Sequence, residues 1–339
     1  MGVRAPKPAL PAGLVLAGAV SVQTGAGFAT RLFGQLPPAS VTTLRLWSAA
    51  LIMVIVAGRP TARALAGLRR RAGWRDAAVT VAFGVALGFM NFAIYQAFAR
   101  VPLGIAVTIE FLGPLTVTVA GAASASGTGT VSLSGRRALS LGYAALAALG
   151  VVLLAHGAAA HLNWAGVAWA VAAGAAWACY ILGSKTTGQR MPGSSGLVVA
   201  MCVAAVVVTA PGLAVGVPAM FRPSLLVLGA CIGLLSSVIP YWLELEALRR
   251  IPTSLFGVWM SVQPAVAALI GLAVLSQRLS APEWAGIGCV VAASAGAAGT
   301  ARGTGGAGAA LAPQPPALAA SRPPAAAVAA EADPARTER

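Results

Sequence analysis

Long apolar stretches alternate with short polar or basic connections from near the start of the chain to about residue 300. Most of the stretches are about 20 residues long, the length an α-helix needs to cross the roughly 30 Å hydrocarbon core of a bilayer. We therefore expect an all-α polytopic membrane protein. The pattern predicts ten transmembrane helices, at about residues 10–30, 41–57, 76–99, 102–122, 138–156, 164–184, 196–217, 224–247, 252–275 and 281–299.

Composition supports this class and argues against two others. Of 339 residues, 58% are hydrophobic and 9% are charged, which is typical of membrane proteins and not of soluble domains. The net charge of +15 comes from basic residues scattered between apolar stretches, so we expect no nucleic-acid partner. The four cysteines lie inside apolar stretches without metal-ligand spacing, so we interpret them as small packing residues and expect no metal or cofactor. They are Cys179, Cys202, Cys231 and Cys289.

The distribution of Lys and Arg predicts the orientation. With the N-terminus in the cytoplasm, most of these residues fall on the cytoplasmic side, including the most basic connection at 59–75. Ten spans return the C-terminal segment to the same side. The preference for Arg, Ala and Gly hints at a GC-rich bacterial genome, so we expect a bacterial inner-membrane protein with both termini in the cytoplasm. Arg45 alone lies inside a span, and we expect it to snorkel outward or to pair.

The fourth apolar stretch contains a carboxylate near mid-membrane. Glu110 follows Pro102 by eight residues, which places it about 12 Å into the hydrocarbon layer. Ionisable residues at this depth are costly and mark functional sites by default. Pro114 lacks an N–H and leaves the Glu110 carbonyl without its helical partner, so both groups suit an ammonium, another cation or a proton. The structural alternative is a Pro kink beside a protonated Glu that bonds a neighbouring helix.

A repeat connects this stretch to the second half of the chain. With an offset of 150 residues, ARVPLGIAVTIEFLGPL aligns with RRIPTSLFGVWMSVQPA, so that Pro102 matches Pro252 and Pro114 matches Pro264. Each copy is the fourth of five spans, and an odd number of spans makes the two halves cross the membrane in opposite senses. We therefore predict two inverted five-helix repeats with a substrate site near the midplane between them.

The chain then divides into three parts. Residues 1–157 form the first five-helix repeat and residues 158–300 form the second, inverted one. Residues 301–339 are rich in Ala, Pro and Gly, cannot bury a core, and are predicted to be a disordered cytoplasmic tail.

Polar residues on the third and eighth spans predict a cavity between the halves. Asn91 and Tyr95 are four residues apart, and Tyr241 and Glu244 are three apart, so each pair shares a helix face. Three further residues line the same cavity or bond between helices, namely Gln23, Thr24 and Tyr180. Glu246 is interpreted differently, as a solvated ion pair with Arg249 and Arg250.

Three segments carry a family resemblance: PLGIAVTIEFLGPL at 102–115, ALRRIP at 247–252 and FGVWMSVQPAVAAL at 256–269. They resemble the EamA group of the drug/metabolite transporter superfamily, and in particular its bacterial threonine and homoserine exporters. The resemblance implies an inverted-repeat exporter of amino acids or similar metabolites, driven by the proton gradient. Such exporters commonly read Met-Ser-x-Glu-Pro where this chain has Gln263 before Pro264, which leaves Glu110 as the stronger proton-carrier candidate.

We therefore expect a small-molecule substrate, with the proton as coupling ion, at a site formed by Glu110, Asn91, Tyr95, Tyr241, Glu244 and Gln263, with Pro114 and Pro264 as helix-breaking residues. One alternative is a transporter of the same fold for a drug or a sugar or nucleoside metabolite, which Trp242 and Trp259 would suit. A lipid-modifying enzyme would need an acid–base pair or metal cluster near the headgroups. We find no such motif in the sequence, so we expect no catalytic residues and no enzyme.

Overall fold

The computed structural model describes residues 9–71, 74–124, 133–157, 163–190, 195–216 and 219–300, and these segments are helical apart from short connections. The predicted tail at 301–339 lies outside the described residues, as do Arg4 and Lys7. The first half contains α1 (Ala9–Arg31), α2 (Pro38–Arg71), α3 (Trp74–Phe98), α4 (Leu103–Glu110), α5 (Leu112–Ser124) and α6 (Leu133–Gly157). The second half contains α7 (Trp164–Arg190), α8 (Ser195–Gly216), α9 (Pro223–Gly233), α10 (Ile239–Leu248), α11 (Thr253–Met260), α12 (Gln263–Leu275) and α13 (Ala281–Thr300).

The predicted spans are all helical. Within the described part of the chain, nine segments are long and apolar enough to cross a membrane, and α13, the tenth predicted span, is a less apolar helix of 20 residues. A polytopic all-α membrane protein is therefore confirmed. The structure differs at the basic connection predicted for 59–75, because α2 continues beyond its apolar part, Pro38–Val56, as far as Arg71.

Two of the spans are broken at corresponding points. In the first half, α4 has eight residues and ends at Glu110, and α5 has 13 residues and begins at Leu112. In the second half, α11 also has eight residues, and α12 has 13 and begins at Gln263. Pro114 and Pro264 lie in the first turns of α5 and α12. The N–H groups of a first turn have no carbonyl partner within the helix, so the missing N–H of proline costs no helical hydrogen bond there. The shared pattern of two prolines therefore occurs with the same local backbone in both halves.

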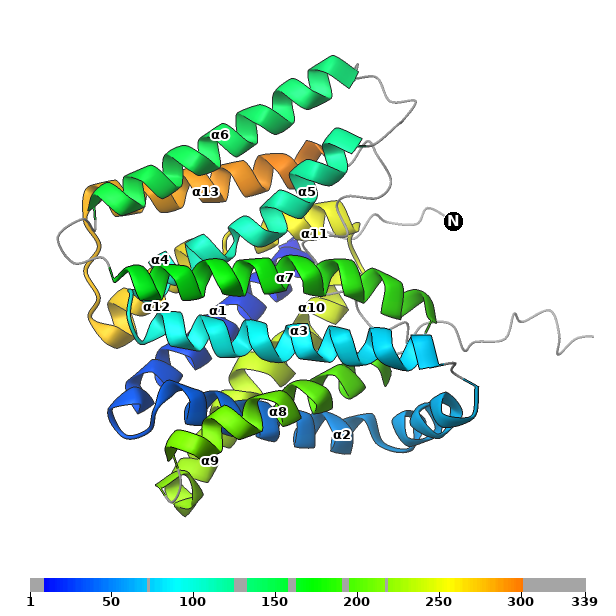
Figure 1. The fold of residues 1–339 in the computed structure, drawn as a ribbon. Helices are drawn as coiled ribbons and strands as arrows, with labels where there is room; N and C mark the ends of the chain where they lie inside the picture. The colour runs from blue at the N-terminus through cyan, green and yellow to red at the C-terminus, as the bar shows by residue number, and fades with distance from the viewer. Residues whose placement is uncertain are drawn as a thin grey trace, which may run out of the picture.

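Helices of one half pack mainly on helices of the other (Figure 1). The pair α3 and α7 corresponds, at the repeat offset, to the pair α10 and α1, and α2 packs on α8 as α6 packs on α13. Glycines permit the close approaches. A Cβ at Gly84 of α3 would lie 2.5 Å from the Val203 side chain of α8, and one at Gly88 would lie 3.0 Å from the Cα atom of Ala204. Gly84 and Gly88 are therefore positions of close packing between α3 and α8.

The outer surface of the bundle is apolar, as a lipid-facing surface must be. Large exposed side chains include Leu51, Ile55 and Val206. The cysteines are free thiols, but the packing role expected for all four is wrong for two of them, because Cys179 and Cys231 are exposed. They lie on the outward faces of α7 and α9, and the apolar pattern alone does not distinguish a lipid-facing position from a packed one.

Candidate functional site

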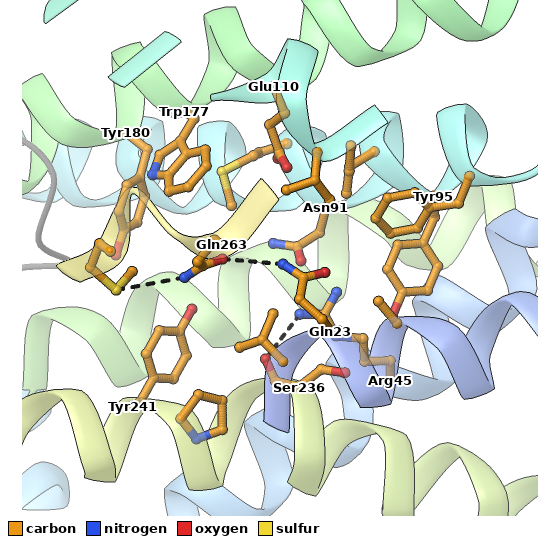
Figure 2. A pocket seen from close by; sticks show the side chains of 18 of the residues that line it. Gln23, Arg45, Asn91, Tyr95, Glu110, Trp177, Tyr180, Ser236, Tyr241 and Gln263 are labelled. Carbon is orange, nitrogen blue, oxygen red and sulfur yellow. Dashed lines mark hydrogen bonds between the residues drawn. The ribbon is translucent and has the colours of Figure 1, made fainter. Parts of the chain in front are cut away.

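A cavity of about 130 Å³ lies between the halves, and its wall combines residues from α1, α2, α3, α4, α7, α10, α11 and α12 (Figure 2). This volume accommodates several waters or a small polar molecule. The polar and aromatic side chains in the wall are Gln23, Arg45, Asn91, Tyr95, Phe98, Glu110, Trp177, Tyr180, Ser236, Tyr241, Glu244 and Gln263. The six residues selected from the sequence as a substrate or proton site are all among them.

Glu110 enters the cavity from the C-terminal end of α4, at the point where the fourth span is broken. Only 8% of its surface is exposed. The carbonyl that Pro114 was expected to free for a cation faces elsewhere. A Cβ on Gly174 of α7 would lie 2.8 Å from this oxygen, so the carbonyl is packed against the α7 backbone. Glu110 therefore lines the cavity, while its carbonyl is packed against α7.

The predicted polar faces of α3 and α10 both border the cavity. Asn91 donates from Nδ2 to the Leu87 carbonyl oxygen at 2.8 Å, which leaves its side-chain oxygen for other partners. Tyr95 is buried, and its hydroxyl has no hydrogen-bond partner among the described residues. From α10, Tyr241 and Glu244 line the wall, and Glu244 is 4% exposed. Each face thus presents buried polar groups to the same space.

Glu246 behaves as the sequence predicted. Its two carboxylate oxygens accept from Arg249 Nη1 at 3.1 Å and from Arg250 Nη2 at 2.5 Å, at the partly exposed end of α10. The pair lies outside the cavity lining.

Two glutamines join the halves across the cavity. Gln23 of α1 donates from Nε2 to Oε1 of Gln263 on α12 at 3.2 Å, and Gln263 Nε2 lies 3.6 Å from the Met260 sulfur. The Gln23 side-chain oxygen is buried, and no described residue donates a hydrogen bond to it. The amide before Pro264 in the second half therefore bonds an amide of the first half.

Aromatic rings close one side of the space. Trp177 of α7 meets Phe111 edge-on at 5.0 Å between ring centroids, and Tyr180, one turn later, stacks on Phe83 at 4.7 Å. Thr24, which the sequence offered together with Gln23 and Tyr180, is not among the lining residues.

Sequence reasoning missed Arg45 as a wall residue. It was expected to snorkel outward or to pair, yet it is 9% exposed and lines the cavity. Its guanidinium carbon lies 5.1 Å from the centre of the Tyr95 ring, within range of a cation–π interaction. Its position as the one basic residue inside a predicted span could have indicated this role.

A second feature missed is a π-helical segment, Leu234–Val238, between α9 and α10. Single π-turns inside α-helices are rare and frequently occur at functional sites. Pro240 lacks the N–H that would bond the Ser236 carbonyl, and Arg45 Nη2 donates to that oxygen at 3.3 Å instead. Ser21 Oγ of α1 donates to the neighbouring Leu235 carbonyl oxygen at 2.7 Å. Pro240, in the middle of an apolar stretch, was the signal in the sequence.

Known proteins with similar sequences are membrane exporters. The EamA-like transporter family matches residues 164–298, from α7 to α13. The chain is 34% identical over 293 residues to the threonine/homoserine exporter RhtA of Escherichia coli strain K12, an alignment that covers 86% of this chain and 92% of the exporter. It is also 34% identical over 296 residues to RhtA of Salmonella typhimurium strain LT2, with the same coverage.

A solved crystal structure shares the fold. It superposes with a TM-score of 0.54 and 20% sequence identity, over 84% of this chain and 96% of the other. At this identity the similarity extends to the helical architecture alone.

Proposed function

Because the chain belongs to the EamA-like transporter family, as a relative of the bacterial threonine/homoserine exporters, we propose that it exports small amino acids of the threonine and homoserine type. The protein is a multi-pass inner-membrane transporter of the drug/metabolite superfamily and not an enzyme. The observation that carries the proposal is the cavity, in which buried polar residues from both halves face one another. Its size suits a small polar molecule.

Proton coupling is the second part of the proposal. Glu110 and Glu244 are buried carboxyls in the cavity wall, and neither forms a salt bridge with another described residue. A carboxyl in such a place binds and releases a proton or a substrate ammonium as access changes from one side of the membrane to the other. We assign the proton to Glu110, because it lies at the helix break where a small backbone movement changes its surroundings.

The two halves are proposed to be inverted repeats that rock about this cavity. The matched broken spans and the exchanged helix pairs support this arrangement. In inverted-repeat transporters the site lies between the repeats, and alternating access arises when one repeat moves against the other. The proposed boundaries are those expected from the sequence, residues 1–157 and 158–300.

The proposal is tested with purified protein in proteoliposomes of fixed orientation under an imposed pH gradient. We expect radiolabelled L-threonine and L-homoserine to move in the direction opposite to the proton flow. This movement should stop when a protonophore abolishes the gradient. A panel of drugs, sugars and nucleosides is offered in parallel. Accumulation of one of these compounds without any amino-acid movement would replace the proposed cargo.

The two tryptophans that suggested a drug, sugar or nucleoside cargo do not support it in the structure. Trp242 is 66% exposed on the outside of α10, and Trp259 packs in a small apolar cluster with Val15 and Phe256. Neither lines the cavity. Trp177 does, so an aromatic cargo remains part of the panel.

The proposed orientation predicts a labelling pattern. In a cysteine-free background, Ala66→Cys in the basic 59–75 segment should be protected from an impermeant thiol reagent in intact cells, and Ala160→Cys should react. Removal of the native cysteines is needed because Cys179 and Cys231 are exposed. Permeabilised cells provide the control, since both positions should then react. Labelling of Ala66→Cys alone in intact cells would invert the assigned topology.

A further inference from the structure

Arg45 carries a positive charge into the cavity wall, and it forms no salt bridge with any described residue. Its hydrogen bonds, both from Nη2, reach the Ser236 carbonyl oxygen at 3.3 Å and Ser237 Oγ at 3.5 Å. Both are longer than the usual range of about 2.7–3.2 Å. The Nε atom is buried with no partner. Burying a guanidinium without an ionic partner costs free energy, so an anion in the cavity would stabilise this one.

Two hydroxyl groups in the same wall also lack partners. They are Tyr95 Oη and Ser236 Oγ, and both are buried. The Tyr95 ring lies against the guanidinium and restrains it, and Ser236 accepts from it through its carbonyl. One N–H and two O–H donors from residues of the same cavity wall thus have no hydrogen-bond partner among the described residues. Oxygen acceptors with a negative charge satisfy such a set best, and a carboxylate matches the fork of an arginine.

The backbone holds Ser236 in this place. The π-turn and Pro240 free its carbonyl for Arg45, and α1 approaches closely because residue 25 is a glycine. A Cβ at Gly25 would lie 2.2 Å from Ser236 Oγ and 3.1 Å from its backbone nitrogen. Ser236 is therefore held between α1, which packs against it at Gly25, and α2, which bonds its carbonyl through Arg45.

We propose that Arg45, Tyr95 and Ser236 form a subsite that binds the α-carboxylate of the exported amino acid. The inference rests on the proposed function and adds to it, because it assigns the end of the substrate opposite to the ammonium. In the view of Figure 2, Arg45 and Ser236 lie on one side of the Gln23–Gln263 pair and Glu110 lies on the other. A small zwitterion placed between them meets a cation at its carboxylate and a carboxyl at its ammonium.

The test compares L-threonine with L-threoninamide, which keeps the amine and the hydroxyl but has a neutral amide in place of the carboxylate. Binding to the purified full-length protein is measured by protection against thermal unfolding, and transport is measured as inhibition of L-threonine counterflow in proteoliposomes. Wild-type protein should prefer threonine. Arg45→Gln should lower the affinity for threonine about 10- to 100-fold and leave that for threoninamide nearly unchanged, so that the preference disappears.

Matched variants keep the test decisive. Arg278→Gln changes an exposed arginine outside the cavity and should retain the wild-type preference. Tyr95→Phe and Ser236→Ala each remove one donor and should reduce the preference about 3- to 10-fold, which tests the subsite if Arg45→Gln does not fold. Arg45→Lys keeps the charge without the fork and should bind with intermediate affinity.

The outcomes separate the inference from the function on which it rests. An unchanged preference in Arg45→Gln, or in both hydroxyl variants, overturns the subsite while leaving amino-acid export intact. An equal loss for threonine and threoninamide also overturns it, because Arg45 would then only balance the charge of Glu110. Failure of the wild-type protein to bind or move either compound refutes the proposed function itself, and the subsite with it.

Discussion

Glu110→Gln is expected to abolish proton-driven export while the protein still folds and inserts. Glutamine keeps nearly the same shape and hydrogen-bonding capacity as a protonated glutamate but cannot ionise. If Glu110 only bonded a neighbouring helix, the amide would replace it with little loss, because a neutral group costs less to bury. The measurement is L-threonine movement in proteoliposomes with and without a pH gradient.

Counterflow in the same variant identifies what Glu110 binds. Exchange of threonine without net proton movement should continue if the carboxyl carries only the proton, and should stop if it also holds the substrate ammonium. Glu246→Gln is the matched control, because its carboxylate forms exposed pairs with Arg249 and Arg250 outside the cavity. It should transport normally. Wild-type, pH-dependent export by Glu110→Gln would remove Glu110 from the mechanism and leave Glu244 as the candidate.

Gly113→Ala is expected to cause a large loss of stability from a single methyl group. A Cβ at this position in α5 would lie 2.0 Å from the carbonyl oxygen of Gly174 in α7. The new Cβ would be attached to the α5 backbone, and the Gly174 oxygen belongs to the α7 backbone. The clash is therefore relieved only if α5 and α7 move apart. Overpacking of this kind costs about 3 kcal/mol. Thermal unfolding of the detergent-purified protein measures the effect.

The control is an alanine in a glycine position with free space. A Cβ at Gly142 of α6 meets nothing within 4 Å, so Gly142→Ala should be neutral or raise the free energy of unfolding by up to about 1 kcal/mol through helix propensity. Equal stability of the two variants would mean that the α5–α7 contact is looser than the structure has it. Loss of transport by Gly113→Ala at a temperature where it stays folded would connect this contact to Glu110, three residues before it.

Much of the architecture was predictable because the membrane limits the choices. A chain that satisfies its backbone in hydrocarbon forms helices of nearly fixed length, so the apolar stretches located the long helices, nine of which, in the described part of the chain, are apolar enough to span a membrane. The same constraint selected Glu110, Asn91 and Tyr241, since a polar side chain at that depth seeks other polar groups. The structure brings them to one cavity.

The features that the sequence did not predict depend on contacts with residues of other helices or on a local change of backbone. Arg45 could snorkel or turn inward, and the choice was set by the Tyr95 ring and the Ser236 carbonyl, which come from other helices. The direction of the Glu110 carbonyl was likewise set by Gly174, through an approach of two backbones that no local pattern indicates. The π-turn at Leu234–Val238 contains one more residue than an α-helical turn, so it changes the direction in which the following side chains point. Mean hydropathy over a whole span does not detect such a local change.

The broken spans repeat one backbone twice but carry different chemistry around the cavity. Glu110 ends α4 where Met260 ends α11, and Asn91 in the first half corresponds to Tyr241 in the second at the repeat offset. The cavity wall therefore presents groups of three kinds, a carboxyl, a guanidinium and amides, that do not recur at the corresponding positions of the two halves. We expect a wall of this kind to distinguish the two enantiomers of a chiral substrate. D-threonine presents the same groups in the opposite hand and cannot match them all at once, so it should compete poorly with the L-enantiomer in the counterflow assay. The residues that differ between corresponding positions of the two halves therefore contribute to the preference for one enantiomer that we expect of this wall.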